Sequence, residues 1–229
     1  MIFATKIPKA LSEQLYNFSD WFYAQQLQDT VHMRPKAFDA DYAVSNDYLE
    51  LLKARPDNIG FPEESYGADF KDVGVYDTNV YFDRVKQLDK SLMDFTGSRN
   101  CALKMYYPPG GYIGWHNNAN APGYNILFTY SETGDGDFRY IHPQTGELVI
   151  MPDPKGWSCK VGYYDVVGGS PLWHAAHTGC NRLNWAYIIH PTLWADMADE
   201  LGIDVNAISD IFGRDPHNDT DAASKFVRR

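Results

Sequence analysis

The chain has 229 residues, enough for one domain with a large core. A hydrophobic fraction of 44% and a charged fraction of 22% are ordinary for a globular protein, while 15% aromatic residues can fill a core or a small-molecule pocket. The net charge is −10, and the only adjacent basic pair is Arg228-Arg229. Duplex binding needs clustered Lys and Arg side chains, so we expect no nucleic-acid partner.

The cysteines are Cys101, Cys159 and Cys180, an odd number without CxxC spacing, so neither a disulfide framework nor a thiolate zinc site is indicated. The first residues lack the order of a signal peptide, and no apolar run approaches the thickness of a bilayer. We therefore expect a cytoplasmic protein with no membrane partner.

Residues 1–98 are expected to form a mainly helical support region. Apolar residues recur at helical spacing from Leu11 to Phe22, and Ser12 suits the start of that helix. A second helix is expected over Tyr42–Arg55, because Pro56 cannot continue it.

The stretch from 56 to 76 is rich in Gly, Pro and Asp and is typical of a loop. Asp77 or Thr78 can cap the helix that follows, and Gly97 can close it. Its expected apolar face consists of Tyr81, Val85, Leu88, Leu92 and Phe95.

Residues 99–191 change pattern and are expected to form the β core. Short runs rich in Tyr, Val, Ile and Trp alternate with Gly, Pro and Asn clusters, which favours a sandwich, barrel or jelly roll. The expected strands are Ala102–Tyr107, Tyr124–Tyr130, Asp137–Ile141, Trp157–Tyr163 and Asn181–His190. Residues 192–229 return to helix, at Leu193–Leu201 and Asp204–Phe212, before a loose polar tail.

Two histidines of the β core have informative neighbours. A single His in a β domain is usually a satisfied polar residue, although imidazole is also the commonest metal ligand. In the first segment, a strand ends at Tyr107, a Gly pair turns the chain, and His116 and Asn118 follow. In the second, His174 precedes a Gly-containing turn, and Arg182 then enters a β-rich run.

This ordered set, spanning Leu103 to Ile189, resembles the iron(II)- and 2-oxoglutarate-dependent oxygenases, especially their prolyl-hydroxylase-like branch. That family shows a Tyr, a His-x-Asp, a later His and a basic residue eight to ten positions further on. The Gly-rich turn Gly134–Phe138 is a weaker match. The resemblance implies a mainly β fold, with a double-stranded β-helix (jelly roll) core flanked by N- and C-terminal α-helices. It also implies iron(II) as cofactor and 2-oxoglutarate as co-substrate.

By this resemblance the catalytic metal ligands are His116, Asn118 and His174. Two imidazoles from two strands would hold the metal on one face and leave positions open. His177 is the alternative to His174, but it precedes Arg182 by only five residues, whereas His174 precedes it by eight, as in the family.

The resemblance further implies that 2-oxoglutarate chelates the metal through its 1-carboxylate and 2-oxo group. The far carboxylate then needs a cation, and Arg182 offers a planar bidentate fork. Tyr107 can add a hydrogen bond, and Asn184 stands where the family often has a Ser. Strand alternation would place Arg182, Asn184, Ala186 and Ile188 on one face.

Asn118 stands where the family has a carboxylate. Its amide oxygen can coordinate a hard cation but brings no charge, so metal affinity should fall. Relatives that lack the carboxylate and bind halide use a smaller residue, so halogenation is not favoured. Asp135 and Asp137 belong to the Gly-rich turn and are not expected to replace it.

The leading hypothesis is therefore an oxygenase, most simply a hydroxylase, that acts on a small molecule or a peptide. A second hypothesis is a non-catalytic or metal-binding jelly-roll protein that has lost the chemistry, for which Asn118 is the best support. A third is a cupin-like metalloenzyme that works without 2-oxoglutarate, in which Arg182 would be incidental. The aromatic residues that could surround the cavity mouth or simply pack in the core are Tyr112, Trp115, Tyr124, Trp157 and Trp173.

Overall fold

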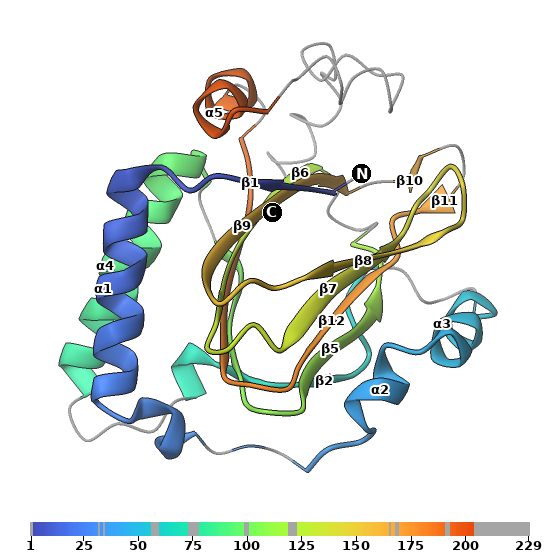
Figure 1. Ribbon diagram of the computed structural model, residues 1–229, viewed down its shortest axis with the longest axis horizontal. Helices are drawn as coiled ribbons and strands as arrows, with labels where there is room; N and C mark the ends of the chain where they lie inside the picture. The colour runs from blue at the N-terminus through green and yellow to red at the C-terminus, as the bar shows by residue number, and fades with distance from the viewer. Residues whose placement is uncertain are drawn as a thin grey trace.

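The computed structural model describes residues 2–31, 33, 35–55, 60–72, 78–98, 101–118, 123–164, 166–167, 170–190 and 193–203. Two antiparallel sheets form the centre, with helices on the outside (Figure 1). This arrangement confirms the expected mainly β jelly roll with flanking helices.

The larger sheet has six strands, and sequence neighbours are seldom spatial neighbours within it. Its order is β1 (Ile2–Thr5), β9 (Gly156–Tyr164), β6 (Gly123–Ser131), β13 (Arg182–Ile188), β4 (Cys101–Tyr107) and β3 (Ala68–Asp69). The five-stranded sheet has the order β2 (Ser65–Tyr66), β5 (Gly111–His116), β12 (His174–Thr178), β7 (Gly136–Ile141) and β8 (Leu148–Pro152). Two short strands, β10 (Val166–Val167) and β11 (Ser170–Pro171), pair with each other.

The helices cover the outer faces of the two sheets. The helices are α1 (Lys9–Ala24), α2 (Ala40–Ala43), α3 (Asn46–Lys53), α4 (Thr78–Thr96) and α5 (Trp194–Leu201), with 3-10 turns at Leu27–Thr30 and Phe70–Asp72. α1 and α4 lie side by side and pack with the six-stranded sheet in the main core (Figure 1). There Phe70 stacks on Trp185 and Phe18 meets the same ring edge to face. α3 packs on the other sheet, where Leu49 and Leu52 contact the cluster around Trp115.

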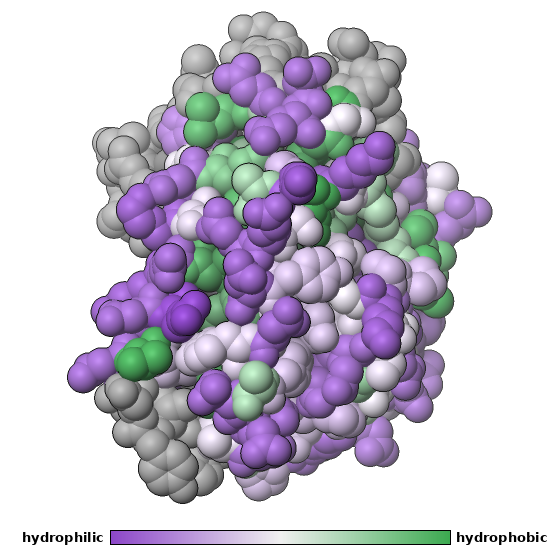
Figure 2. All heavy atoms as spheres, turned by 60° about the vertical axis from the view of Figure 1, so that its left-hand side comes forward, coloured by the Kyte–Doolittle hydropathy of each residue, from purple (hydrophilic) through white to green (hydrophobic). Residues whose placement is uncertain are grey.

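The main core therefore lies between helices and sheet, which leaves the space between the two sheets for a site. Figure 2 looks onto the helical side of the molecule, where hydrophobic residues appear in small separated groups among hydrophilic ones. Within the described part of the chain, none of the helices has the length and apolar character to cross a bilayer.

Two details of the expected helices are wrong. α1 begins at Lys9 after Pro8, so Ser12 lies inside the helix and its amide donates to the Pro8 carbonyl (2.9 Å). The second expected helix is divided into α2 and α3, because the Ser45 side chain accepts a hydrogen bond from the Tyr48 amide (3.2 Å) and caps a new helix. Asp77 and the helix expected at 204–212 lie outside the described residues.

Each expected strand is present to within a few residues, but eight other strands among the described residues were not expected. β1, β2 and β3 come from the stretch expected to be helix or loop, and β5, β8, β10, β11 and β12 come from stretches between the expected strands. β12 has the sequence HAAHT and β5 carries two glycines, and neither composition is typical of a strand. Both are held by pairing with neighbours on either side, which local composition cannot reveal.

Candidate functional site

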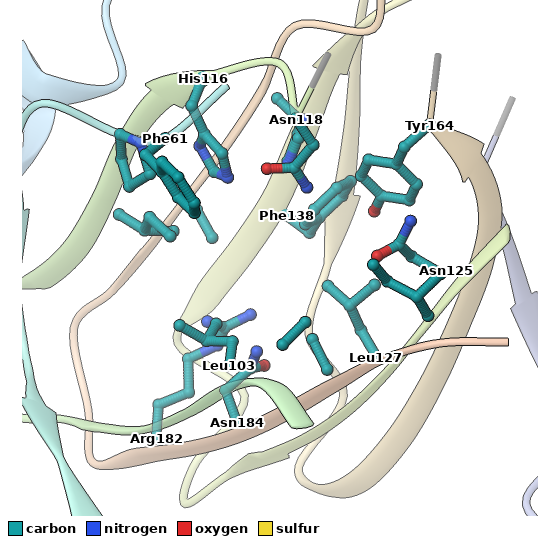
Figure 3. A pocket seen from close by; sticks show the side chains of 17 residues that line it. Phe61, Leu103, His116, Asn118, Asn125, Leu127, Phe138, Tyr164, Arg182 and Asn184 are labelled. Carbon is teal, nitrogen blue, oxygen red and sulfur yellow. The ribbon is translucent and has the colours of Figure 1, made fainter. Parts of the chain in front are cut away.

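A cavity of about 350 Å³ lies between the two sheets and receives side chains from both (Figure 3). Figure 3 shows His116 and Asn118 toward one end and Arg182 and Asn184 toward the other. His174 lines the cavity at the first end, because its ring centre is 4.0 Å from that of His116. The walls between them are mainly apolar and include Leu103, Ile113, Leu127, Phe138 and Ala176. A mostly apolar cavity with a few convergent polar groups is the usual form of a small-molecule site.

His116 and His174 lie directly opposite each other on β5 and β12, and their ring centres are 4.0 Å apart. The next pair in the ladder is Ala176 with Ile113, so β5 carries one extra residue there. This bulge lets both Ile113 and His116 line the cavity although strict alternation would point them to opposite faces. Gly114 suits the bulge, because a Cβ there would come within 3.0 Å of the Glu64 carbonyl oxygen.

Both imidazoles are held as neutral rings. Nδ1 of His116 lies 2.9 Å from the Gly114 carbonyl oxygen, and Nδ1 of His174 lies 2.9 Å from that of Leu172. A carbonyl only accepts, so each Nδ1 carries the proton and each Nε2 keeps its lone pair. Burial lowers the pKa of His116 to about 4, and burial together with the neighbouring His116 lowers that of His174. Neutral imidazoles fixed through the other ring nitrogen are prepared to bind a metal.

Asn118 stands two residues beyond His116 in left-handed backbone conformation, with φ of 52°. The backbone N–H of Asn118 donates to the Gly60 carbonyl (3.1 Å), and the backbone N–H of Gly60 donates to Asn117 Oδ1 (3.0 Å), so the 60–64 segment holds this corner in place. Figure 3 shows the Asn118 side chain beside the His116 ring at the cavity. Among the described residues, no group of three His, Cys, Asp or Glu side chains could hold a metal, so a third protein donor here would be an amide oxygen.

A buried charge cluster lies at the Arg182 end. Asp153 accepts from Arg182 Nε at 2.9 Å and from Lys160 Nζ at 2.6 Å, and the side chains are 0%, 3% and 3% exposed. Burial raises the pKa of the Asp153 carboxyl, but the two cations outweigh it and lower that pKa overall. Two cations and one anion leave one positive charge, and Arg182 is the member that lines the cavity.

Two polar groups near Arg182 have unused hydrogen-bonding capacity. Asn184 Oδ1 accepts from the Thr129 hydroxyl (2.7 Å), which leaves its amide nitrogen at the cavity. Tyr107 pairs with Arg182 across β4 and β13, and the guanidinium carbon lies 5.8 Å from its ring centre. The Tyr107 hydroxyl is buried with no hydrogen-bond partner in the described part of the chain, and burial raises its pKa to about 12 despite Arg182.

His177 and the acidic residues of the Gly-rich turn lie away from the cavity. His174 lines the cavity, whereas His177 Nδ1 is 3.4 Å from Asp137 Oδ2, and Asp137 also accepts from Arg139 Nε at 2.8 Å. Neither Asp135 nor Asp137 lines the cavity. Strand alternation accounts for the difference between the two histidines, which are three residues apart.

Sequence reasoning missed Asp153, Lys160, Asn125, Tyr164 and Phe61. The sequence offered one clue, in β9. Cys159 and Val161 point to the main core, so Lys160 between them must point to the opposite face, into the space between the sheets. A buried Lys requires a partner. None of the five aromatic residues considered for the cavity mouth lines the cavity; Tyr112, Trp115, Tyr124, Trp157 and Trp173 are all buried in packed surroundings.

No protein-family model and no curated protein sequence matches this chain. Solved structures that resemble it include a prolyl-4-hydroxylase from Pseudomonas putida, 13% identical over 83% of this chain and 92% of that one, with a TM-score of 0.41. They also include the dioxygenase for auxin oxidation 1 from Arabidopsis thaliana in complex with 2-oxoglutarate, 13% identical over 83% of each chain, with a TM-score of 0.34. A predicted oxalate decarboxylase from Thermotoga maritima is 25% identical over 44% of this chain and 72% of that one, with a TM-score of 0.25. These TM-scores are low, and the chemistry available at the site follows from the positions of its own residues.

Proposed function

We propose that this protein is an iron(II)- and 2-oxoglutarate-dependent oxygenase, most simply a hydroxylase, with His-x-Asn in place of His-x-Asp. One observation carries the proposal: a single cavity has two neutral, buried imidazoles toward one end and a buried cluster with one net positive charge toward the other. Such a cavity suits a metal chelated by a ligand that also carries a distant carboxylate.

The donor set fits iron(II). His116 and His174 would bind through Nε2, and the Asn118 amide oxygen would be the third donor. Two imidazoles with one oxygen donor correspond in type to the usual non-haem iron site, with a neutral oxygen replacing the carboxylate. Because an amide is a weaker donor for a hard cation than a carboxylate, we expect iron affinity to be lower than with Asp at this position.

Arg182 would hold the distal carboxylate of 2-oxoglutarate. Asp153 and Lys160 fix Arg182 and leave one unit of positive charge, which one carboxylate neutralises. The amide nitrogen of Asn184 can donate to the same carboxylate. The Tyr107 hydroxyl also lacks a partner among the described residues, and its ring centre lies 5.8 Å from the Arg182 guanidinium carbon, but Tyr107 is not among the residues that line the cavity.

When bound, iron(II) would let dioxygen oxidise 2-oxoglutarate to succinate and carbon dioxide, with one oxygen atom entering succinate and the other the hydroxylated substrate. The chain itself would hold the metal and the co-substrate in place and enclose them. The apolar walls exclude water and so strengthen charge interactions inside the cavity. The backbone hydrogen bonds of His116 and His174 keep both rings neutral and oriented.

The test is an anaerobic titration of the iron-loaded protein with 2-oxoglutarate, followed by the visible charge-transfer band. Arg182→Ala should weaken 2-oxoglutarate binding by at least roughly tenfold, because losing one partner of a buried charge pair costs about 2–5 kcal/mol. The matched control is Arg139→Ala, which also removes an arginine paired with an aspartate but does not line the cavity.

Three outcomes would contradict parts of the proposal. Metal binding without 2-oxoglutarate binding would favour the cupin-like alternative. Binding of both without formation of succinate would favour a protein that has lost the chemistry. Equal 2-oxoglutarate affinity in the parent and Arg182→Ala would remove the role given to Arg182.

A further inference from the structure

Tyr164 brings to the cavity a hydroxyl that is separate from the groups that would hold iron and 2-oxoglutarate. Its side chain lines the cavity, the residue is 1% exposed, and its hydroxyl has no hydrogen-bond partner within the described residues. A buried hydroxyl without a partner costs free energy, on the order of 1–3 kcal/mol, unless a ligand satisfies it. The ring centres of Tyr164 and His174 are 4.7 Å apart, so Tyr164 lies at the end of the cavity where the metal would bind.

Asn125 lies on the same wall as Tyr164. β6 and β9 pair so that Gly123 faces Tyr164 and Asn125 faces Gly162, which makes Asn125 and Tyr164 diagonal neighbours on one face of the sheet. Asn125 Nδ2 donates to the Gly123 carbonyl (3.0 Å), which leaves its amide oxygen for the cavity. Figure 3 shows the Asn125 amide beside the Tyr164 hydroxyl. The wall therefore offers one donor and one acceptor next to each other.

Phe61 contributes an apolar surface at the mouth of the same cavity. It lines the cavity but is 76% exposed, the largest exposed fraction among the large hydrophobic side chains of the described residues. Figure 3 shows Phe61 and Tyr164 on either side of His116 and Asn118. An exposed aromatic ring at the mouth gains burial when a flat apolar ligand covers it.

The charge of the lining restricts the ligand further. Among the described residues that line the cavity, Arg182 is the only ionised side chain, and the proposed function assigns it to 2-oxoglutarate. A carboxylate beside Tyr164 and Asn125 could accept from the Tyr164 hydroxyl but could not donate to the Asn125 amide oxygen, and a cation would lie close to the metal ion with no anionic side chain among the described lining residues. The group held there should therefore be neutral and should both accept and donate hydrogen bonds.

We infer that Tyr164, Asn125 and Phe61 form the binding site of the primary substrate, which is a small uncharged molecule with an apolar, flat body and a carboxamide-like or hydroxyl group. Tyr164 donates to that group, Asn125 accepts from it, and Phe61 covers the apolar body. The inference rests on the proposed function for the place of iron and 2-oxoglutarate. A cavity of about 350 Å³ is near the lower end for ligand pockets, which disfavours a large substrate.

The test uses three probes of similar size: benzamide, which is neutral and polar; benzoate, which is anionic; and toluene, which has no polar group. Each is titrated by ligand-observed NMR into the full chain saturated with zinc(II), which is redox-inactive, and 2-oxoglutarate. We expect benzamide to bind more tightly than benzoate, because a carboxylate cannot donate a hydrogen bond to the Asn125 amide oxygen.

Tyr164→Phe should raise the Kd of benzamide by about two- to tenfold, the net worth of one neutral hydrogen bond, and should leave toluene unchanged. Tyr163→Phe is the matched control, because it removes a hydroxyl from the neighbouring residue, which packs in the main core instead of lining the cavity. Thermal melting of both variants checks folding, and replacing Tyr by Phe preserves the ring.

Phe61→Ala should weaken benzamide and toluene by a similar factor of about two- to tenfold, whereas Leu148→Ala, at a residue 50% exposed on β8, should change neither. The inference is overturned if benzamide fails to bind the parent at millimolar concentration, if benzoate binds more tightly, or if Tyr164→Phe equals the parent. If 2-oxoglutarate itself does not bind, the proposed function fails separately, and the same titrations on the metal-free protein still test Tyr164 and Phe61.

Discussion

Asp153→Asn is expected to destabilise the protein far more than an ordinary loss of an ion pair. The substitution keeps the side-chain volume but leaves Arg182 and Lys160 as two buried cations, each 3% exposed, without their shared anion. Breaking a buried pair by removing one partner typically costs about 3–5 kcal/mol. We therefore expect the free energy of unfolding to fall by about that amount, a large part of the total stability of a domain.

The assay is urea denaturation followed by tryptophan fluorescence, with far-UV circular dichroism as a second probe. Asp94→Asn is the matched control, because it removes an aspartate paired with Lys90 on the surface, where the side chains are 65% and 72% exposed. Such exposed pairs contribute about 0–1 kcal/mol.

Adding Lys160→Met to Asp153→Asn removes one of the two unpaired cations and should recover part of the loss. Since Asp153 and Lys160 contact each other, the two effects should not add. A decrease in the free energy of unfolding below about 1 kcal/mol for Asp153→Asn alone would refute the view that the three side chains form a closed charge cluster.

Three further predictions concern the metal end of the cavity. His174→Ala should abolish iron(II) or manganese(II) binding in calorimetry and His177→Ala should not; the reverse would show that the wrong histidine was chosen. Asn118→Asp should raise metal affinity and the formation of succinate without substrate, because a carboxylate is the better donor for a hard cation; no change in either quantity would show that position 118 is not a ligand. The metal-free protein should lose stability as the pH falls from about 6.5 to about 4. The pKa of His116 is lowered to about 4 in the folded protein, so the unfolded chain binds more protons in this pH window. The free energy of unfolding should therefore decrease by up to about 3 kcal/mol across it. Urea midpoints at pH 7 and pH 5, compared with His116→Asn, measure this term, and equal pH dependence in both proteins would contradict it.

The sequence alone indicated most of the elements that carry the candidate site. Helical spacing predicted α1 and α4, and the Gly and Pro clusters predicted the turns between strands, because both patterns are local. The family resemblance carried by the order of His116, His174 and Arg182 implied that these side chains share a site, and all three line one cavity. Period-two alternation predicted that Arg182, Asn184, Ala186 and Ile188 lie on one face, and all four line that cavity.

The tertiary structure decided which distant partners complete the site. The bulge that brings Ile113 and His116 to one face depends on the register between β5 and β12, which is a property of pairing and not of composition. Asp153 comes from the segment after β8 and reaches Arg182 on β13 only because the two sheets close over it. Tyr164 and Phe61 likewise stand about a hundred residues apart in sequence, and only the fold places both at one cavity. Whether a side chain is buried, and whether its polar group has a partner, depends on which segments pack together.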